Sequence, residues 1–348
     1  MRSTLFLLAV LACSDGSACA EPSPCVEIQS QLSVVAKYLA QGDSAAADQA
    51  LGNLDETHPD CPEAILNRAR LLGLKGDASA EDVFVHYNNL KLRDARGYAY
   101  YARFLLDQGE YQRADAVSMM ATDYDPDEPV GMAVRGQLKA MKGNTLDGIH
   151  LLEQACKVNP DDEEARFQLG SIYDRSRHPK QAIEHFTEAL KISSLDARAW
   201  DYLALNLEPL GEEDRAMDAY KHGLAVNLPG SHFDAFLPYN YGRFLMKHND
   251  LSGSKEQLDK AVELTAQVRA PWYERARLNL RLKNYPQARH DAEKALALED
   301  PQGVIVDLQV YALLEQIYSR LGEAELAHKY AELGRVTPPP LPDDTDSR

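Results

Sequence analysis

Residues Pro129–Ser194 (PVGMAVRGQLKAMKGNTLDGIHLLEQACKVNPDDEEARFQLGSIYDRSRHPKQAIEHFTEALKISS) decide the fold, because the two halves of this stretch follow one pattern. Each half reads as two short amphipathic helices, with apolar residues three and four positions apart. Small residues recur at matching places: Gly136 and Gly170 in the first helix, Ala155 and Ala189 in the second. The stretch therefore predicts a repeated helix pair, which must stack on its neighbours to bury its apolar stripe.

The residue that ends the first helix of each pair extends this pattern over most of the chain. Successive positions are 34, 33, 34, 34, 34, 38, 34 and 39 residues apart. Most are Gly and one is Asn, the two residues that best accept the left-handed backbone conformation that ends a helix. The positions are Gly42, Gly76, Gly109, Gly143, Arg177, Gly211, Asn249, Lys283 and Gly322. The spacing predicts nine helix pairs.

The residue types inside the pairs resemble the tetratricopeptide repeat. The sixth pair reads Trp200-x-x-Leu203-Ala204 in its first helix and Ala216-x-x-x-Tyr220 in its second, where that family has large-x-x-Leu-small and Ala-x-x-x-large. The resemblance implies an all-α fold, a right-handed superhelical solenoid of about nine helix-turn-helix units over residues 26–334.

The unit boundaries follow from the period. We expect units near residues 28–61, 62–94, 95–128, 129–162, 163–196, 197–234, 235–268, 269–307 and 308–334. The second unit fits least well, since Glu81 stands where the family usually has Ala. Two joints, Leu228–Asp234 and Glu299–Val306, are longer than the period. Such inserts either change the local angle between units near a binding site or are simple drift in loop length.

Residues 1–20 read as an export signal. Arg2 supplies the positive start, Leu5–Ala12 the apolar segment and Ala18-Cys19-Ala20 a small-residue cleavage site. A second interpretation competes, because Val10-Leu11-Ala12-Cys13 resembles a bacterial lipobox, in which Cys13 would be lipidated. We expect the protein to be exported, either to the periplasm or out of the cell. The alternative is a lipoprotein whose only membrane contact is a lipid anchor. Residues 21–25 would form a short linker, and residues 335–348 a disordered, proline-rich and acidic tail.

The cysteines agree with export. Cys25 precedes the first helix of the first unit and Cys61 follows its second helix, and these ends lie side by side in an antiparallel pair. A disulfide between them is therefore geometrically plausible, the alternative being two unrelated free thiols. We interpret Cys156, next to Ala155 in a second helix, as a small buried hydrophobe.

Charge and motifs argue against several functions. The net charge of −17 disfavours nucleic-acid and anionic-membrane binding, and no apolar run reaches the roughly 20 residues that span a bilayer. No metal-binding, phosphate-binding or nucleophile motif is present in the sequence, so we predict no enzyme activity, no cofactor and no metal.

The resemblance also implies a binding surface. In the family, the first helices line a concave groove, and fixed positions of each unit point into it. On this register the groove residues are Arg103, Phe167, Arg175, Tyr239, Arg243, Lys247, Tyr273, Arg277, Arg281 and Arg320. Several form a basic, aromatic strip in the C-terminal units, which suits a protein partner with an acidic or extended segment. The alternative is a solvated face in which these cations pair with local Asp and Glu.

These observations together predict a non-enzymatic scaffold for protein–protein interaction in a bacterial-type cell envelope or secretion assembly. Two alternatives stay open. One is an envelope lipoprotein that assists pilus or exopolysaccharide export, and the other is a protein whose groove binds an anionic glycan.

Overall fold

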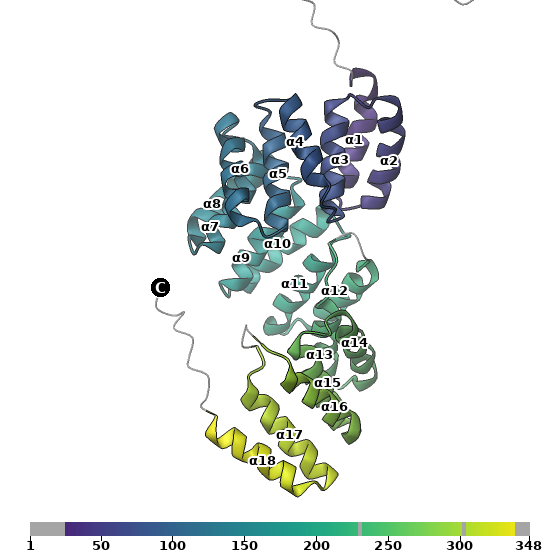
Figure 1. Cartoon of the computed structure of the whole chain (residues 1–348), viewed down its shortest axis with the longest axis vertical. Helices are drawn as coiled ribbons and strands as arrows, with labels where there is room; N and C mark the ends of the chain where they lie inside the picture. Colours follow the sequence, from purple (N-terminus) through teal and green to yellow (C-terminus); the bar gives the residue numbers. More distant parts are fainter. Residues whose placement is uncertain (1–24, 229–231, 301–303, 338–348) are drawn as a thin grey trace, which may run out of the picture. The chain divides into compact units, whose positions relative to one another are not determined.

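The fold is built from helix pairs (Figure 1). In this computed structural model, residues 25–228, 232–300 and 304–337 are described, apart from the side chain of Asp55. They contain 18 α-helices and no strand, which confirms the all-α prediction and its nine pairs. The proposed signal, Cys13, residues 21–24 of the linker and the tail after residue 337 lie outside the described residues.

Four pairs form the first compact unit, which ends at Asn159 (unit 1). A short 3₁₀ turn, η1 (Val26–Ile28), leads into it. Its helices are α1 (Gln29–Ala40), α2 (Ser44–Thr57), α3 (Pro62–Leu74), α4 (Ala80–Leu90), α5 (Ala95–Asp107), α6 (Tyr111–Tyr124), α7 (Pro129–Met141) and α8 (Thr145–Val158).

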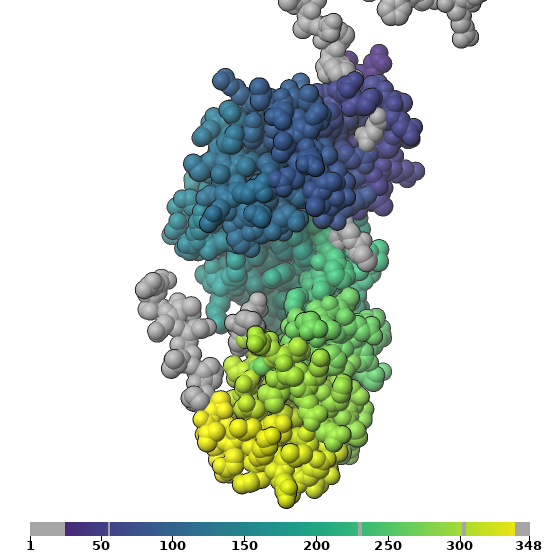
Figure 2. Space-filling view, in the orientation of Figure 1, coloured from purple at the N-terminus to yellow at the C-terminus, as the bar shows by residue number. Residues whose placement is uncertain are grey.

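Five pairs form the second compact unit, which starts at Pro160 (unit 2). Its helices are α9 (Glu163–Arg175), α10 (Pro179–Ile192), α11 (Ala197–Leu207) with η2 (Glu208–Leu210), α12 (Glu213–Val226), α13 (Leu237–Lys247), α14 (Leu251–Leu264), α15 (Arg269–Arg281), α16 (Tyr285–Ala297), α17 (Asp307–Leu321) and α18 (Ala324–Val336). Figure 2 shows its last three pairs, green to yellow, packed in chain order. Helix α18 runs two residues past the predicted boundary at residue 334.

Each first helix ends where the sequence predicted. All nine residues that we expected to end a first helix have positive φ, from 58° at Arg177 to 88° at Gly143. In this conformation the chain turns sharply enough for the second helix to fold back along the first. The 34-residue spacing is therefore the spacing of these turns.

Small residues let paired helices touch. A Cβ atom added to Gly148 of α8 would lie 2.7 Å from the carbonyl oxygen of Gly136 of α7, and one added to Gly136 would lie 2.9 Å from the carbonyl oxygen of Gly148. The two backbones are thus in direct contact, and any side chain there would separate them.

The second pair keeps this rule with a one-residue change of register. Ala80, at 0% exposure, occupies the small-residue position of α4. The prediction that Glu81 stands at this position is therefore wrong by one residue. Glu81 instead lies at the surface, where its Oε1 accepts a hydrogen bond from the Tyr101 hydroxyl at 2.8 Å and forms an ion pair with Arg113.

Both long joints are fixed to the helices at their described ends. In the first joint, Asn227 and Asp234 exchange two hydrogen bonds of 2.7 and 2.8 Å. At the second, the guanidinium of Arg269, 8% exposed, donates to the carbonyl oxygens of Leu298 (2.8 Å) and Ile305 (2.9 Å) and to the Asp307 carboxylate (2.6 Å). A buried arginine with several acceptors indicates a specific structure at this joint.

Candidate functional site

The basic, aromatic strip of unit 2 is built from equivalent positions of two neighbouring first helices. On α13 the Arg243 guanidinium lies 5.5 Å from the centre of the Tyr239 ring, and on α15 the Arg277 guanidinium lies 5.9 Å from that of Tyr273. Each pair is four residues apart, which places both side chains on one helix face. A cation above a tyrosine ring is attracted to its electron-rich face. The register therefore produces the same arginine–tyrosine pair twice.

The cations of the strip differ in whether they already bind an acceptor within the chain. Arg277 donates from Nη1 to both oxygens of Glu274, at 2.8 and 3.0 Å, and Glu274 is only 4% exposed. Arg281 donates to the Met246 carbonyl oxygen at 2.7 Å. Arg243 and Lys247 are both exposed, and neither forms an ion pair with any residue that the structure describes.

The tyrosine at the centre of the strip is largely covered. Tyr239 is 8% exposed, and burial raises the pKa of its hydroxyl, while the nearby Arg243 lowers it. The Tyr239 ring is thus mostly buried beneath the strip, and Arg243 and Lys247 of α13 are its accessible groups. This arrangement can bind a carboxylate and can place an apolar group against the strip.

Three other predicted groove residues belong to other first helices. Arg320 on α17 and Arg175 on α9 are exposed, and Arg103 on α5 is half-buried.

Phe167 differs from its expected position. It is 5% exposed and packs against Phe186 and Tyr202, with ring centres 5.6 and 5.8 Å away. The guanidinium of Arg198 covers the ring at 4.4 Å. Phe167 is therefore a core residue and its ring is not available to a partner, because the next first helix supplies an arginine that lies over it.

Unit 1 contains a hollow that the sequence reasoning missed. Its volume is about 330 Å³, and it lies among the first helices α1, α3 and α5. Arg70 of α3 lies over the Tyr100 ring of α5 at 4.1 Å and donates to Asn67 at 3.1 Å, so an arginine–tyrosine pair recurs here. The lining also includes Gln29, Leu32 and Ala36 of α1, Glu63 and Leu66 of α3, and Arg96 of α5. The fixed groove positions that identified the strip, when they are counted in the first three units, identify most of these residues.

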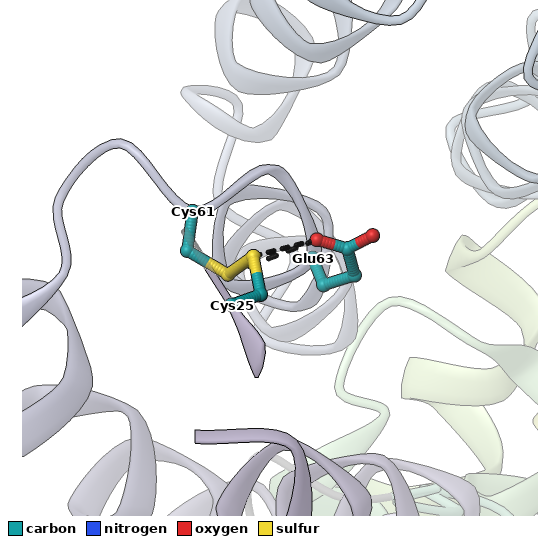
Figure 3. A group of neighbouring side chains, drawn as sticks. All are labelled: Cys25, Cys61 and Glu63. Atoms are coloured by element: carbon teal, nitrogen blue, oxygen red, sulfur yellow. Dashed lines mark hydrogen bonds between the residues drawn. A yellow bond between two sulfur atoms is a disulfide. The ribbon is translucent and has the colours of Figure 1, made fainter. Parts of the chain in front are cut away.

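Cys25, which lines this hollow, forms a disulfide with Cys61. Figure 3 shows the bond with Glu63 beside it. Cys25 and Cys61 are joined by an S–S bond of 2.09 Å, as the side-by-side helix ends suggested. The Glu63 carboxylate lies against it, with Oε2 2.7 Å from the Cys25 sulfur and 3.8 Å from the Cys61 sulfur. These three residues bring potential metal ligands together, but the sulfurs are bonded to each other and are not thiolates.

Two pairs of carboxyl groups lie at the first joint of unit 2; Asp201, Glu163 and Asp196 are buried and Asp234 is half-buried. Burial, and then Asp234, holds the pKa of Asp201 well above its usual range, and burial raises the pKa of Asp234 as well. Asn240 donates to Asp201 Oδ2 at 2.7 Å. Glu163 and Asp196 form the second pair, beside His232. The sequence could not reveal these pairs because their members are tens of residues apart.

Comparison with known proteins agrees with the helix pairs. The family model described as tetratricopeptide repeat matches residues 135–197 and 241–304. These two stretches contain repeats from unit 1 and from unit 2. The chain is a tetratricopeptide repeat protein. The repeats outside the matched residues have the same helix pairs and the same left-handed turns.

Curated relatives share single stretches of tetratricopeptide repeats. The human tetratricopeptide repeat protein 7A is 26% identical over 125 residues, and the human mitochondrial import receptor subunit TOM70 is 28% identical over 102 residues. The alignments cover 36% and 29% of this chain, but only 15% and 17% of those proteins.

Solved structures share the fold. The Cut9 and Hcn1 hetero-tetramer of the APC/C contains a chain that superposes with a TM-score of 0.64, at 15% identity, over 86% of this chain and 58% of that one. The Pseudomonas aeruginosa pilF structure superposes with a TM-score of 0.52, at 19% identity, over 61% of this chain and 93% of that one. In the described part of this chain, no helix combines the length and apolarity that crossing a membrane requires.

Proposed function

We propose that this tetratricopeptide repeat protein is a non-enzymatic scaffold, and that the strip on α13 and α15 binds a partner segment that carries acidic groups. The family supports the role of scaffold, since tetratricopeptide repeats bind other proteins. One observation supports the binding of an acidic segment at the strip. Arg243 and Lys247 are exposed and form no ion pair with any described residue, although the chain has a net charge of −17.

The strip offers what an acidic segment needs. Arginine forks bind carboxylates in a bidentate manner, and tyrosine rings provide contact area at a low cost in side-chain entropy. The alternative of a solvated face accounts for Arg277 and Arg281, which have acceptors in the chain. It does not account for Arg243 and Lys247.

Charge reversal at the two exposed cations tests this proposal. We expect Arg243→Glu with Lys247→Glu to abolish capture of the partner from the native extract, whereas circular dichroism should stay unchanged. Arg277 is left intact, because its reversal would place a second acid beside buried Glu274. The matched control, Lys180→Glu with Lys221→Glu, makes the same charge change at exposed positions of the second helices α10 and α12 and should keep the partner.

Equal capture by the groove variant and the control variant would contradict the proposed site. Binding to the strip should also weaken as salt is raised, because exposed charge pairs are screened. Capture that needs no protein partner and survives moderate salt would instead favour the anionic glycan.

We further propose that the protein acts in an oxidising compartment, as an exported component of an envelope or secretion assembly. The Cys25–Cys61 disulfide supports this, because such bonds persist outside the reducing cytosol. The signal-like residues 1–20 point the same way. Mass spectrometry of the mature N-terminus tests it: Glu21 indicates ordinary cleavage, a lipidated Cys13 indicates an envelope lipoprotein such as an accessory of pilus or exopolysaccharide export, and an uncleaved Met1 contradicts export.

A further inference from the structure

Three side chains of unit 2 that are distant in sequence converge on one point. Glu163 is the first residue of α9, Asp196 is the N-cap of α11, and His232 belongs to the joint between α12 and α13. One ligand atom from each lies within 4.8 Å of the other two. His232 Nδ1 is 3.1 Å from Asp196 Oδ2 and 3.8 Å from Glu163 Oε2.

We propose that Glu163, Asp196 and His232 bind a divalent transition-metal ion of the Zn²⁺ type, which holds the α12–α13 joint against α9 and α11. Two carboxylates and one imidazole form a ligand set that suits zinc and its neighbours, and three protein ligands leave a position for water. With metal–ligand bonds of about 2.0–2.1 Å, ligand atoms in a tetrahedral site lie roughly 3.3 Å apart, close to the separations found here.

The strongest indication of a missing cation is Glu163 itself. Its side chain is 4% exposed, and its Oε1 is buried without a hydrogen-bond partner. Buried carboxylate oxygens are normally bonded, so an unsatisfied one needs an explanation such as an ion.

The surrounding charges leave room for a second cation. Three carboxylates, Glu163, Glu164 and Asp196, surround one guanidinium, that of Arg198. Arg198 Nη2 is 2.9 Å from both Glu164 Oε2 and Asp196 Oδ2, so its charge is shared between those two groups. Glu163 accepts no part of it through a hydrogen bond in the described residues. A metal ion bound by Glu163 and His232 would give Glu163 the cation that Arg198 does not supply.

The joint that contains His232 is hydrogen-bonded at its described ends. The two hydrogen bonds between Asn227 and Asp234 tie its ends together, and Asp234 Oδ1 accepts from the Phe236 backbone at 2.7 Å. The joint is four residues longer than the repeat period, and this extra length contains the histidine. The proposal is independent of the strip on α13 and α15, because no residue is shared.

Titration of the EDTA-treated full chain with Zn²⁺ at pH 7.5 tests the site. We expect one equivalent of Zn²⁺ to bind and to raise the melting temperature. His232→Ala should weaken binding by at least about 100-fold, because even second-shell changes cost 10- to 100-fold. Co²⁺ should give a visible absorption band that this variant lacks.

Two further variants keep the test decisive. Glu163→Gln keeps the size of the side chain but removes the carboxylate ligand, and should weaken Zn²⁺ binding by at least about tenfold. His150→Ala changes an exposed histidine of unit 1 and should bind Zn²⁺ like the wild type. Absence of Zn²⁺ binding by the wild type, or binding by His232→Ala and Glu163→Gln as tight as that of the wild type, would overturn the proposal.

Discussion

At the scale of single residues, the left-handed turn shows how local chemistry sets the repeat. Arg177 and Lys283 end first helices with φ of 58° and 59°, although they carry a Cβ atom. This conformation costs a residue with a side chain roughly 1–2 kcal/mol. The chain tolerates the cost at these two turns because the paired helices on either side fix the backbone there.

Relief of that strain is testable at Lys283. Lys283→Gly should stabilise unit 2 by up to about 1 kcal/mol, because glycine adopts positive φ without a steric penalty but loses some of the gain to a more flexible unfolded chain. The free energy of unfolding in urea is the measurement. Gly143→Ala, at φ 88°, should have the opposite sign, and a destabilised Lys283→Gly would show that the lysine side chain contributes more than its backbone strain costs.

The buried Asp201–Asp234 pair predicts a pH dependence. Because the pKa of Asp201 is raised in the folded protein, the folded state keeps a proton that the unfolded state releases above pH 4, and stability falls as pH rises. Asp201→Asn cannot titrate and still offers a donor to Asp234. We expect it to stabilise the protein by about 1–2 kcal/mol at pH 7 and to have little effect near pH 3.

The control for this change is Asp218→Asn, at an exposed position of α12. It should alter the free energy of unfolding in urea by less than about 0.5 kcal/mol at either pH. If Asp201→Asn destabilises at pH 7, Asp201 is ionised in the folded state, and the expectation that the folded state keeps a proton there is wrong.

At the scale of helices, the sequence predicts the helix pairs, but it predicts only part of the side-chain contacts between neighbouring repeats. Period and turn residues are local signals, and they identified all nine turns. The position of Phe167 depends on Arg198, which lies one repeat later, and the group of Glu163, Asp196 and His232 depends on three separate elements. Sequence periodicity shows which face a residue takes, but it does not show which long side chain of the next repeat covers that face.

The first helix pair yields a prediction at this scale. The Cys25–Cys61 bond spans 36 residues, and closing such a loop is worth about 3–4 kcal/mol in the chain-entropy model. Cys25→Ser with Cys61→Ser should therefore loosen α1 and α2, while unit 2 keeps its stability, because repeats contact mainly their neighbours. Hydrogen exchange should speed up in α1 and α2 of this variant.

Reductant provides the matching control. It should loosen α1 and α2 in a Cys156→Ala variant, which retains the disulfide, but should have no effect on the double serine variant. Equal exchange with and without the disulfide would show that packing of the buried residues Leu32, Val35 and Leu51 already holds the first pair.

At the scale of the whole molecule, the net charge of −17 acts on every helix at once. Like charges destabilise a compact state, and salt screens them over a Debye length of about 10 Å at 0.1 M. We therefore expect the free energy of unfolding to rise between 10 and 150 mM NaCl. Exposed local ion pairs such as Lys255 with Asp259 weaken in the same range, but such pairs contribute little, so the rise should prevail.

The two double charge reversals separate this general effect from binding at the strip. Arg243→Glu with Lys247→Glu and Lys180→Glu with Lys221→Glu each lower the net charge by four, so both should show a steeper gain in stability with salt than the wild type. Urea denaturation at 10, 50 and 150 mM NaCl gives the three slopes. Equal slopes for the two variants, together with loss of the partner by the first alone, would show that the strip acts through its position. A much steeper slope for the first would mean that Arg243 and Lys247 stabilise the fold, and that their exposure reflects folding and not recognition.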